Sequence, residues 1–174
     1  MNDVLVLPGR FYGPTSPLCL YASQVAERRG MTVHRHDWTG DVPSAQAPEI
    51  EDYIRAQVVP LLDGIDGRPL LVAKSLGTNA AGLAAERELP AVWLTPLLTF
   101  PWVVEALRRA TAPFLLVGGT NDEAWDSALA RELTPHVLEV PDADHGMYVP
   151  GPLTDSIAVL AQVVVAVEDF LTKV

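Results

Sequence analysis

The sequence predicts an α/β protein of three layers, in which helices cover both faces of a mainly parallel sheet of six strands. Two observations lead to this fold class. Short apolar runs alternate with longer amphipathic runs along the whole chain, and a parallel crossover between strands needs a dozen or more residues, usually a helix. Right-handed crossovers then place helices on both faces of the sheet.

Each element follows from a local pattern. Residues 4–7 are a continuous apolar run closed by a Pro-Gly pair, which is typical of a buried strand. Residues 16–29 repeat apolar side chains every three or four positions and stop at a glycine, as an amphipathic helix does. Residues 31–38 alternate with period two, which indicates a strand near an edge. The same patterns predict further strands at residues 69–72, 91–95, 114–117 and 136–140, and further helices at residues 48–62, 78–86, 102–110, 123–132 and 153–171.

Composition limits the class of protein. With 174 residues, 49% of them hydrophobic and 20% charged, the chain suits one globular domain over residues 1–174. The formal net charge of −10 argues against nucleic-acid binding, because such a surface does not neutralise a polyanion. No apolar run approaches the roughly 18 residues of a membrane span, and residues 1–9 lack the cationic start of a secretory signal. We therefore expect no membrane partner and a cytoplasmic location.

The single cysteine, Cys19, bears on the redox compartment. One cysteine cannot form an internal disulfide, which favours a reducing compartment. Cys19 falls on the apolar face of the predicted helix at residues 16–29, so we interpret it as a small core residue rather than a nucleophile.

A candidate nucleophile lies where the predicted strand at residues 69–72 should turn into a helix. The pentapeptide Ala-Lys-Ser-Leu-Gly is centred there on Ser75. A serine on a tight strand-to-helix turn sits in a strained backbone conformation, and the residues two positions to either side must be small. Ala73 and Gly77 meet that requirement. Lys74 could raise the local positive potential, but such a lysine is more often a solvated side chain.

Asp122 and His145 complete a candidate catalytic triad with Ser75. Each of the three follows the carboxyl end of a predicted strand (the third, fifth and sixth), where ligands bind in parallel sheets. The imidazole of His145 would act as the base towards the Ser75 hydroxyl, and the carboxylate of Asp122 would orient that imidazole. Asp122 also has the alternative role of an N-cap. Asp126 and Asp144 stay open as rival acids.

These segments resemble the small, lidless bacterial α/β-hydrolases, whose triad follows the same chain order of Ser, Asp and His. The resemblance covers residues 4–171 and rests on the pentapeptide at Ser75, on residues 118–122 and on residues 144–146. In this chain Ala73 replaces the first glycine of the G-x-S-x-G motif, and the two antiparallel opening strands of the family are absent. The resemblance implies a serine hydrolase that cleaves carboxylic esters or thioesters through an acyl-serine. The alternative is a binding or partner module with the same fold and no hydrolytic activity.

The tetrahedral intermediate of such a reaction needs two N–H donors for its oxyanion. One is expected from the backbone of Leu76, the residue after the nucleophile, and the other from the loop after the first strand. In that loop we narrowly favour Arg10 over Phe11. The loop lacks the histidine-glycine pair that is common in lipases.

Apolar and aromatic residues near this rim are candidates for the substrate-binding surface, although each could equally pack in the core. An apolar rim suits a small-molecule acyl ester or thioester. We expect no cofactor and no metal, because the histidines are not spaced as ligands and the glycines after the first strand do not form a dinucleotide fingerprint. The candidate lining residues are Phe11, Tyr12, Leu98, Trp102, Trp125 and Met147, with Phe100 and Tyr148 as further members.

Overall fold

The computed structural model describes residues 1–11 and 13–174. Its core is a six-stranded sheet in which every pair of neighbouring strands is parallel. The strand order is β2-β1-β3-β4-β5-β6. The predicted number of strands and their parallel arrangement are thereby confirmed. The strands are β1 (Asp3–Leu7), β2 (Thr32–Arg35), β3 (Leu70–Lys74), β4 (Ala91–Leu94), β5 (Phe114–Gly119) and β6 (Val137–Val140).

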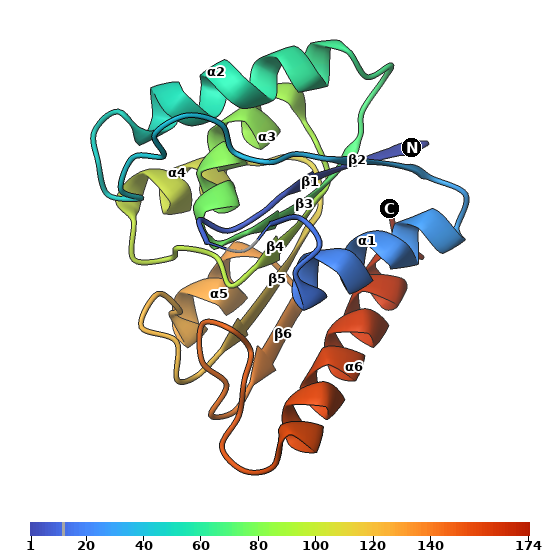
Figure 1. Cartoon of the computed structure of the whole chain (residues 1–174), viewed down its shortest axis with the longest axis vertical. Helices are drawn as coiled ribbons and strands as arrows, with labels where there is room; N and C mark the ends of the chain where they lie inside the picture. The colour runs from blue at the N-terminus through green and yellow to red at the C-terminus, as the bar shows by residue number, and fades with distance from the viewer. Residues whose placement is uncertain (12) are drawn as a thin grey trace.

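Helices cover both faces of this sheet and complete the three layers (Figure 1). On one face α1 (Pro17–Arg28) packs beside α6 (Leu153–Phe170). The connection from β4 to β5 contains a single short helix and two loops, so no large lid covers the carboxyl ends of the strands. The other face is covered by α2 (Ile50–Asp63), the 3-10 helix η1 (Ser75–Ala80), α3 (Ala81–Arg87), α4 (Pro101–Arg109) and α5 (Ser127–Leu133).

The central strands are apolar because helices cover both of their faces. Every residue of β3, β4 and β5 is buried, as is usual for parallel strands between two helical layers. The edge strand β2 is exposed at Thr32 and Arg35. It ends at residue 35 instead of 38, because its pairing with β1 stops at the pair of Val6 and Arg35 and β1 itself ends at Leu7.

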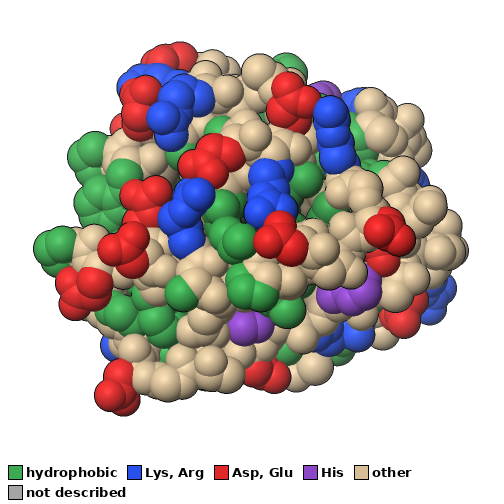
Figure 2. All heavy atoms as spheres, turned by 90° about the horizontal axis from the view of Figure 1, so that it is seen from above, with side chains coloured by type: hydrophobic (Ala, Val, Ile, Leu, Met, Phe, Trp, Pro, Cys, Tyr) green, Lys and Arg blue, Asp and Glu red, His purple; other side chains and the backbone are tan. Residues whose placement is uncertain are grey.

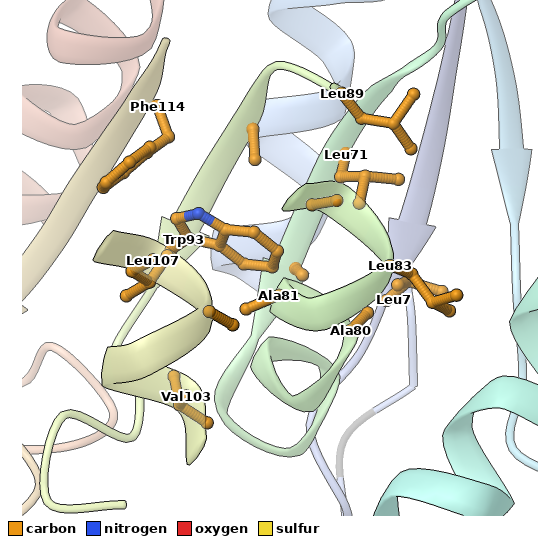
Figure 3. Close-up of a cluster of buried hydrophobic side chains, with 14 of the residues drawn as sticks. Leu7, Leu71, Ala80, Ala81, Leu83, Leu89, Trp93, Val103, Leu107 and Phe114 are labelled. Carbon is orange, nitrogen blue, oxygen red and sulfur yellow. The ribbon is translucent and has the colours of Figure 1, made fainter. Parts of the chain in front are cut away.

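Two hydrophobic clusters fill the spaces between the sheet and the helices. The cluster under α1 and α6 contains Cys19, whose fully buried position agrees with the predicted core role. The cluster on the other face contains Trp93 of β4, which lies close to Ala81 and Leu107 (Figure 3). The indole Nε1 of Trp93 is buried and has no hydrogen-bond partner in the part of the chain that the structure describes.

The helix after β3 begins differently from the prediction. Instead of one α-helix at residues 78–86, the chain forms η1 and becomes α-helical only at Ala81. The hydroxyl of Thr78 donates to the carbonyl oxygen of Ser75 at 2.6 Å, and the amide of Asn79 donates to that of Leu76 at 3.0 Å. These side chains occupy carbonyl groups that an α-helix would use, which favours the tighter turn.

The helix after β5 begins later than predicted, at Ser127 instead of residue 123. Asp126 is its N-cap, since one carboxylate oxygen accepts hydrogen bonds from two backbone N–H groups of the first turn at 3.0 and 2.9 Å. A cap of this kind satisfies donors that have no partner inside the helix. Residues 120–126 therefore form a loop, and Asp122 does not cap α5.

Charges of both signs are distributed over the surface. Figure 2 shows acidic and basic side chains interspersed with apolar ones on the face seen from above. Exposed pairs join α2 to α3, with Arg55 and Glu86 at 2.9 Å and Arg87 and Asp63 at 2.7 Å. Each such pair contributes little to stability. Within residues 1–11 and 13–174, no helix combines the length and the apolar character needed to cross a membrane.

Candidate active site

Ser75 lies directly after β3, at the first position of η1. Its φ of 49° is the left-handed conformation expected at a strained turn between a strand and a helix. Gly77 packs against the end of β1, because a Cβ atom at this position would lie 2.5 Å from the carbonyl oxygen of Leu7. The small residue that the turn requires at Gly77 is thus dictated by the close approach of η1 to β1.

Hydrogen bonds join Ser75, His145 and Asp122 in a chain. The Nε2 atom of His145 lies 2.8 Å from Ser75 Oγ, and its Nδ1 atom lies 2.8 Å from Asp122 Oδ2. The three residues follow β3, β6 and β5, so the parallel sheet brings together side chains that are 70 and 23 positions apart. When Nδ1 donates to the carboxylate, Nε2 is free to accept the proton of the serine hydroxyl.

Both carboxylate oxygens of Asp122 have partners. The side chain is only 2% exposed, and Oδ1 accepts a hydrogen bond from the backbone N–H of Ala124 at 2.9 Å while Oδ2 contacts His145. The loops that carry the two residues touch, because the backbone N–H of Asn121 donates to the carbonyl oxygen of Ala143 at 3.0 Å. The orientation of this carboxylate is therefore held by its own loop and by the neighbouring loop.

The two rival aspartates have other roles. Asp126 caps α5, as described above. Asp144 holds the loop of His145, since its Oδ1 accepts hydrogen bonds from the backbone N–H groups of Gly146 and Tyr148 at 2.8 and 2.9 Å. Of the three candidate acids, Asp122 is the one whose carboxylate contacts the imidazole.

The remaining histidines have different partners. His34 pairs with Asp3 at 2.8 Å, and His36 lies 3.0 Å from the side-chain oxygen of Gln57. Burial lowers the pKa of His36, although the contact with Gln57 opposes that shift. His136 packs edge-on against an aromatic ring of α6. Among the described histidines, His145 is the one whose ring nitrogen contacts the Ser75 hydroxyl.

The loop after β1 runs beside the nucleophile. A Cβ atom added to Gly9 would lie 3.6 Å from the Cβ of Ser75. Leu76, the first predicted oxyanion residue, is buried directly after Ser75. The side chain of Arg10 donates to the carbonyl oxygens of residues 42–43, so a role of Arg10 towards an oxyanion would belong to its backbone N–H.

The residues predicted to line the substrate surface lie in separate places. Leu98 and Trp102 line a surface cavity of about 650 Å³ next to α4. The indole N–H of Trp102 also donates to the side chain of Asn79 on η1 at 2.8 Å. Met147 lines a second cavity, of about 510 Å³, whose wall includes His145.

Tyr148 lines the second cavity together with Met147, whereas Phe11 and Trp125 line neither cavity. Phe11 is 85% exposed on the loop after β1. Trp125 is buried in the core, where its ring leaves no room for a Cβ atom on Gly118 and its N–H donates to Glu139 at 2.7 Å. Tyr12 lies outside the residues that the structure describes.

Lys74, for which the sequence favoured a solvated side chain, is buried. It is 6% exposed, and its Nζ donates to Thr95 Oγ1 and to the carbonyl oxygen of His145, both at 3.1 Å. Burial lowers the pKa of Lys74, while nearby acidic groups oppose that shift. Thr95 is fully buried with a φ of 43°, an unfavourable conformation for a β-branched residue. Lys74 therefore ties β3, β4 and the histidine loop together beside Ser75.

The described residues support neither a metal site nor a cysteine nucleophile. The part of the chain that the structure describes contains no group of three or more His, Cys, Asp or Glu side chains placed to hold a metal ion. Burial raises the pKa of the Cys19 thiol, which keeps it protonated and unreactive.

No family model matches the chain, and no curated protein matches it in sequence. Solved structures do match it. Est1E from Butyrivibrio proteoclasticus gives a TM-score of 0.72 at 15% identity over 99% of this chain and 89% of that one. Alpha/beta hydrolase domain-containing protein 10 from mouse gives 0.69 at 16% identity over 98% and 90%. A monoacylglycerol lipase from Paleococcus ferrophilus gives 0.65 at 15% identity over 94% of each chain. The chain has the α/β-hydrolase fold.

The α/β-hydrolase fold explains why the site lies at one edge of the sheet. Crossovers of a parallel sheet leave the carboxyl ends of the strands open, and ligands bind there. Ser75, Asp122 and His145 all follow such ends. The fold that the sequence resemblance implied is therefore confirmed. At 15–16% sequence identity, these matches show a shared fold and nothing finer.

Proposed function

We propose that this chain is a serine hydrolase that cleaves carboxylic esters or thioesters through an acyl-serine. The observation that carries the proposal is the continuous hydrogen-bond chain from Ser75 Oγ through the imidazole of His145 to Asp122 Oδ2. A serine hydroxyl becomes nucleophilic when a neighbouring base takes its proton during attack. The 2.8 Å contact to Nε2 supports His145 as that base.

The reaction follows from these positions. Ser75 Oγ attacks the carbonyl carbon while its proton passes to Nε2 of His145, and Asp122 stabilises the imidazolium that forms. Backbone N–H groups of Leu76 and Arg10 would bind the oxyanion of the tetrahedral intermediate. When the intermediate collapses, Nε2 returns the proton to the leaving oxygen or sulfur and the acyl group stays on Ser75. A water molecule, activated by the same imidazole, then releases the carboxylic acid.

The substrate class has independent support. Among the matching structures are Est1E with ferulic acid bound and a monoacylglycerol lipase. The first therefore binds an organic acid, and the second is named for an ester substrate. The absence of a large lid leaves the carboxyl edge of this sheet open to a small-molecule ester. We also propose a cytoplasmic location, which the single buried cysteine, Cys19, supports.

A fluorophosphonate probe tests the proposal directly. The wild-type protein should be labelled on the peptide that contains Ser75, and Ser75→Ala should lose the label and lower kcat by about 10⁴ to 10⁶ while unfolding at the same urea concentration. A protein that remains unlabelled and hydrolyses no ester would instead be a binding or partner module on this fold. Labelling on another residue would show that the nucleophile is that residue and not Ser75.

A further inference from the structure

A cavity of about 510 Å³ lies beside His145 and is not used by the chemistry described so far. It opens between the first turn of α1, the first two turns of α6 and the loop that carries the histidine. Its wall is mainly apolar, with Leu18 from α1, Met147 from the loop and Leu160 from α6. Its volume falls in the range of about 300–1,000 Å³ that is usual for small-molecule sites.

The position of this cavity distinguishes between the two halves of an ester. Its wall includes His145 and Lys74, whereas Ser75, Leu76 and Arg10 do not contribute to it. The leaving oxygen takes its proton from Nε2 of His145 and must therefore come within about 3 Å of that atom. The group attached to the leaving oxygen then lies beside the imidazole, while the acyl group remains attached to the serine.

We propose that this cavity is the subsite for the leaving group and that it takes an uncharged alkyl or aryl alcohol, or the corresponding thiol. The inference rests on the serine-hydrolase function proposed above. The bond between the carbonyl carbon and the leaving oxygen breaks with its electron pair on oxygen, and Nε2 of His145 donates one proton. The neutral alcohol then departs through the cavity.

The charged groups in the wall favour a neutral ligand. Besides His145 they are Lys74 and Asp144, which have opposite signs. The Nζ of Lys74 already donates to two oxygens, and Asp144 already accepts two backbone hydrogen bonds. An ionic ligand would give up its hydration against the apolar remainder of the wall without a free counter-charge, which is costly.

The mouth of the cavity carries exposed apolar side chains. Leu153 and Ile157, one helical turn apart on α6, line it and are 65% and 57% exposed. Exposed apolar groups that gather at a cavity are typical of ligand-binding grooves. An alkyl or aryl group held in the cavity would cover both side chains, which gives the leaving group apolar contact area that increases with its length.

The test compares two series of esters on the wild-type protein. In the alcohol series, methyl acetate is compared with butyl acetate, so that three methylenes are added to the leaving group. Burial of each methylene should raise kcat/KM about fourfold, which corresponds to ~0.8 kcal/mol, so butyl acetate should exceed methyl acetate by about 60-fold. In the acyl series, methyl acetate is compared with methyl pentanoate, which adds the same methylenes to the other half.

A variant at the mouth of the cavity provides the second arm. Ile157→Trp should reduce the ratio of butyl to methyl acetate to below about fivefold, because the indole occupies the space of the alkyl chain. The ratio in the acyl series should stay at its wild-type value. Val165→Trp is the matched control, since Val165 is 54% exposed two turns further along α6 and does not line the cavity. It should retain both wild-type ratios.

Several results would overturn the leaving-group subsite. One is a ratio of kcat/KM near one between butyl and methyl acetate. A second is an Ile157→Trp variant that lowers the ratio in the acyl series instead of the alcohol series. A third is a Val165→Trp variant that lowers the alcohol-series ratio as much as Ile157→Trp does. In each of these cases esters are still hydrolysed and Ser75 is still labelled, so the proposed function survives. A protein that hydrolyses no ester and takes no fluorophosphonate label would overturn the proposed function itself, and the leaving-group assignment with it.

Discussion

Replacement of Asp122 by Asn should remove most of the hydrolytic activity, whereas the same replacement at Asp126 should leave it nearly unchanged. The two side chains are four residues apart and differ in what they contact. Asp122 Oδ2 lies 2.8 Å from Nδ1 of His145, while Asp126 accepts hydrogen bonds from the first turn of α5. The pair therefore separates catalysis from helix capping.

The expected magnitudes follow from these contacts. An amide at position 122 can donate to Nδ1 and stabilise the wrong imidazole tautomer, and in another serine triad the same exchange lowers kcat by about 10⁴, or ~5.4 kcal/mol of barrier. At position 126 Asn caps a helix about as well as Asp. Only Asp126→Ala should remove the cap, with a loss of about 1 kcal/mol, which lowers Tm by about 2–4 °C in a chain of this length.

The assay combines kcat for a short-chain ester with thermal unfolding followed by circular dichroism. Asp122→Asn should be almost inactive and fold normally. Asp126→Asn should resemble the wild type, and Asp126→Ala should be less stable but active. If Asp126→Asn lost several orders of magnitude in kcat while Asp122→Asn remained active, the carboxylate that orients the imidazole would be one turn further along the chain.

Three further variants test other parts of the structure. His145→Gln should abolish the acid limb of the profile of kcat/KM against pH together with most activity, because only a neutral imidazole accepts the serine proton; His136→Gln should keep the wild-type profile. Lys74→Met should reduce the increase in the free energy of unfolding with pH in the alkaline range. Burial lowers the pKa of Lys74, so between its folded and unfolded pKa values the unfolded chain binds more protons and wild-type stability rises with pH; an unchanged slope in urea unfolding would contradict this. Trp93→Phe should lower the free energy of unfolding by less than about 2 kcal/mol, whereas truncation of a large core side chain costs about 3–5 kcal/mol. The loss is smaller because the substitution also removes a buried N–H that has no acceptor among the described residues. A larger decrease, measured by urea unfolding, would mean that Nε1 has a partner.

Local sequence patterns were sufficient for most of the fold, because strands and helices of this sheet are defined by short-range periodicity. β1, β3, β4 and β5 are continuous apolar runs, and the structure buries almost all of their residues. The start of α5 was predicted four residues too early, because hydrophobic periodicity does not identify which residue caps a helix. Asp122 and Asp126 are equally good caps by residue type, and the tertiary contact to His145 decides between them.

The candidate site was predictable where chain order and strand ends specify it, and not where a side chain finds a distant partner. Ser75, Asp122 and His145 each follow a strand end, so their meeting could be inferred from topology. The partners of Lys74 are 21 and 71 positions away, and its only signal in the sequence was a cation at the end of a buried strand. Trp125 is an aromatic residue in a loop near the rim, and nothing local indicates that it packs on Gly118.

The backbone conformations around the site have a consequence for any attempt to engineer this protein. Four of the five non-glycine residues with positive φ in the described chain lie close to the site. Ser75 is in the turn of the nucleophile, Thr95 accepts a hydrogen bond from Lys74, and Asp142 and Met147 are in the histidine loop. Each such conformation costs about 1–3 kcal/mol, which is large beside a total stability of about 5–15 kcal/mol. Selection for heat resistance alone would therefore favour glycine at these positions and relax the geometry that holds the imidazole against the serine. Stabilising substitutions are better sought on the outer face of α2, which lines neither cavity beside the site and where the trade-off between stability and activity does not apply.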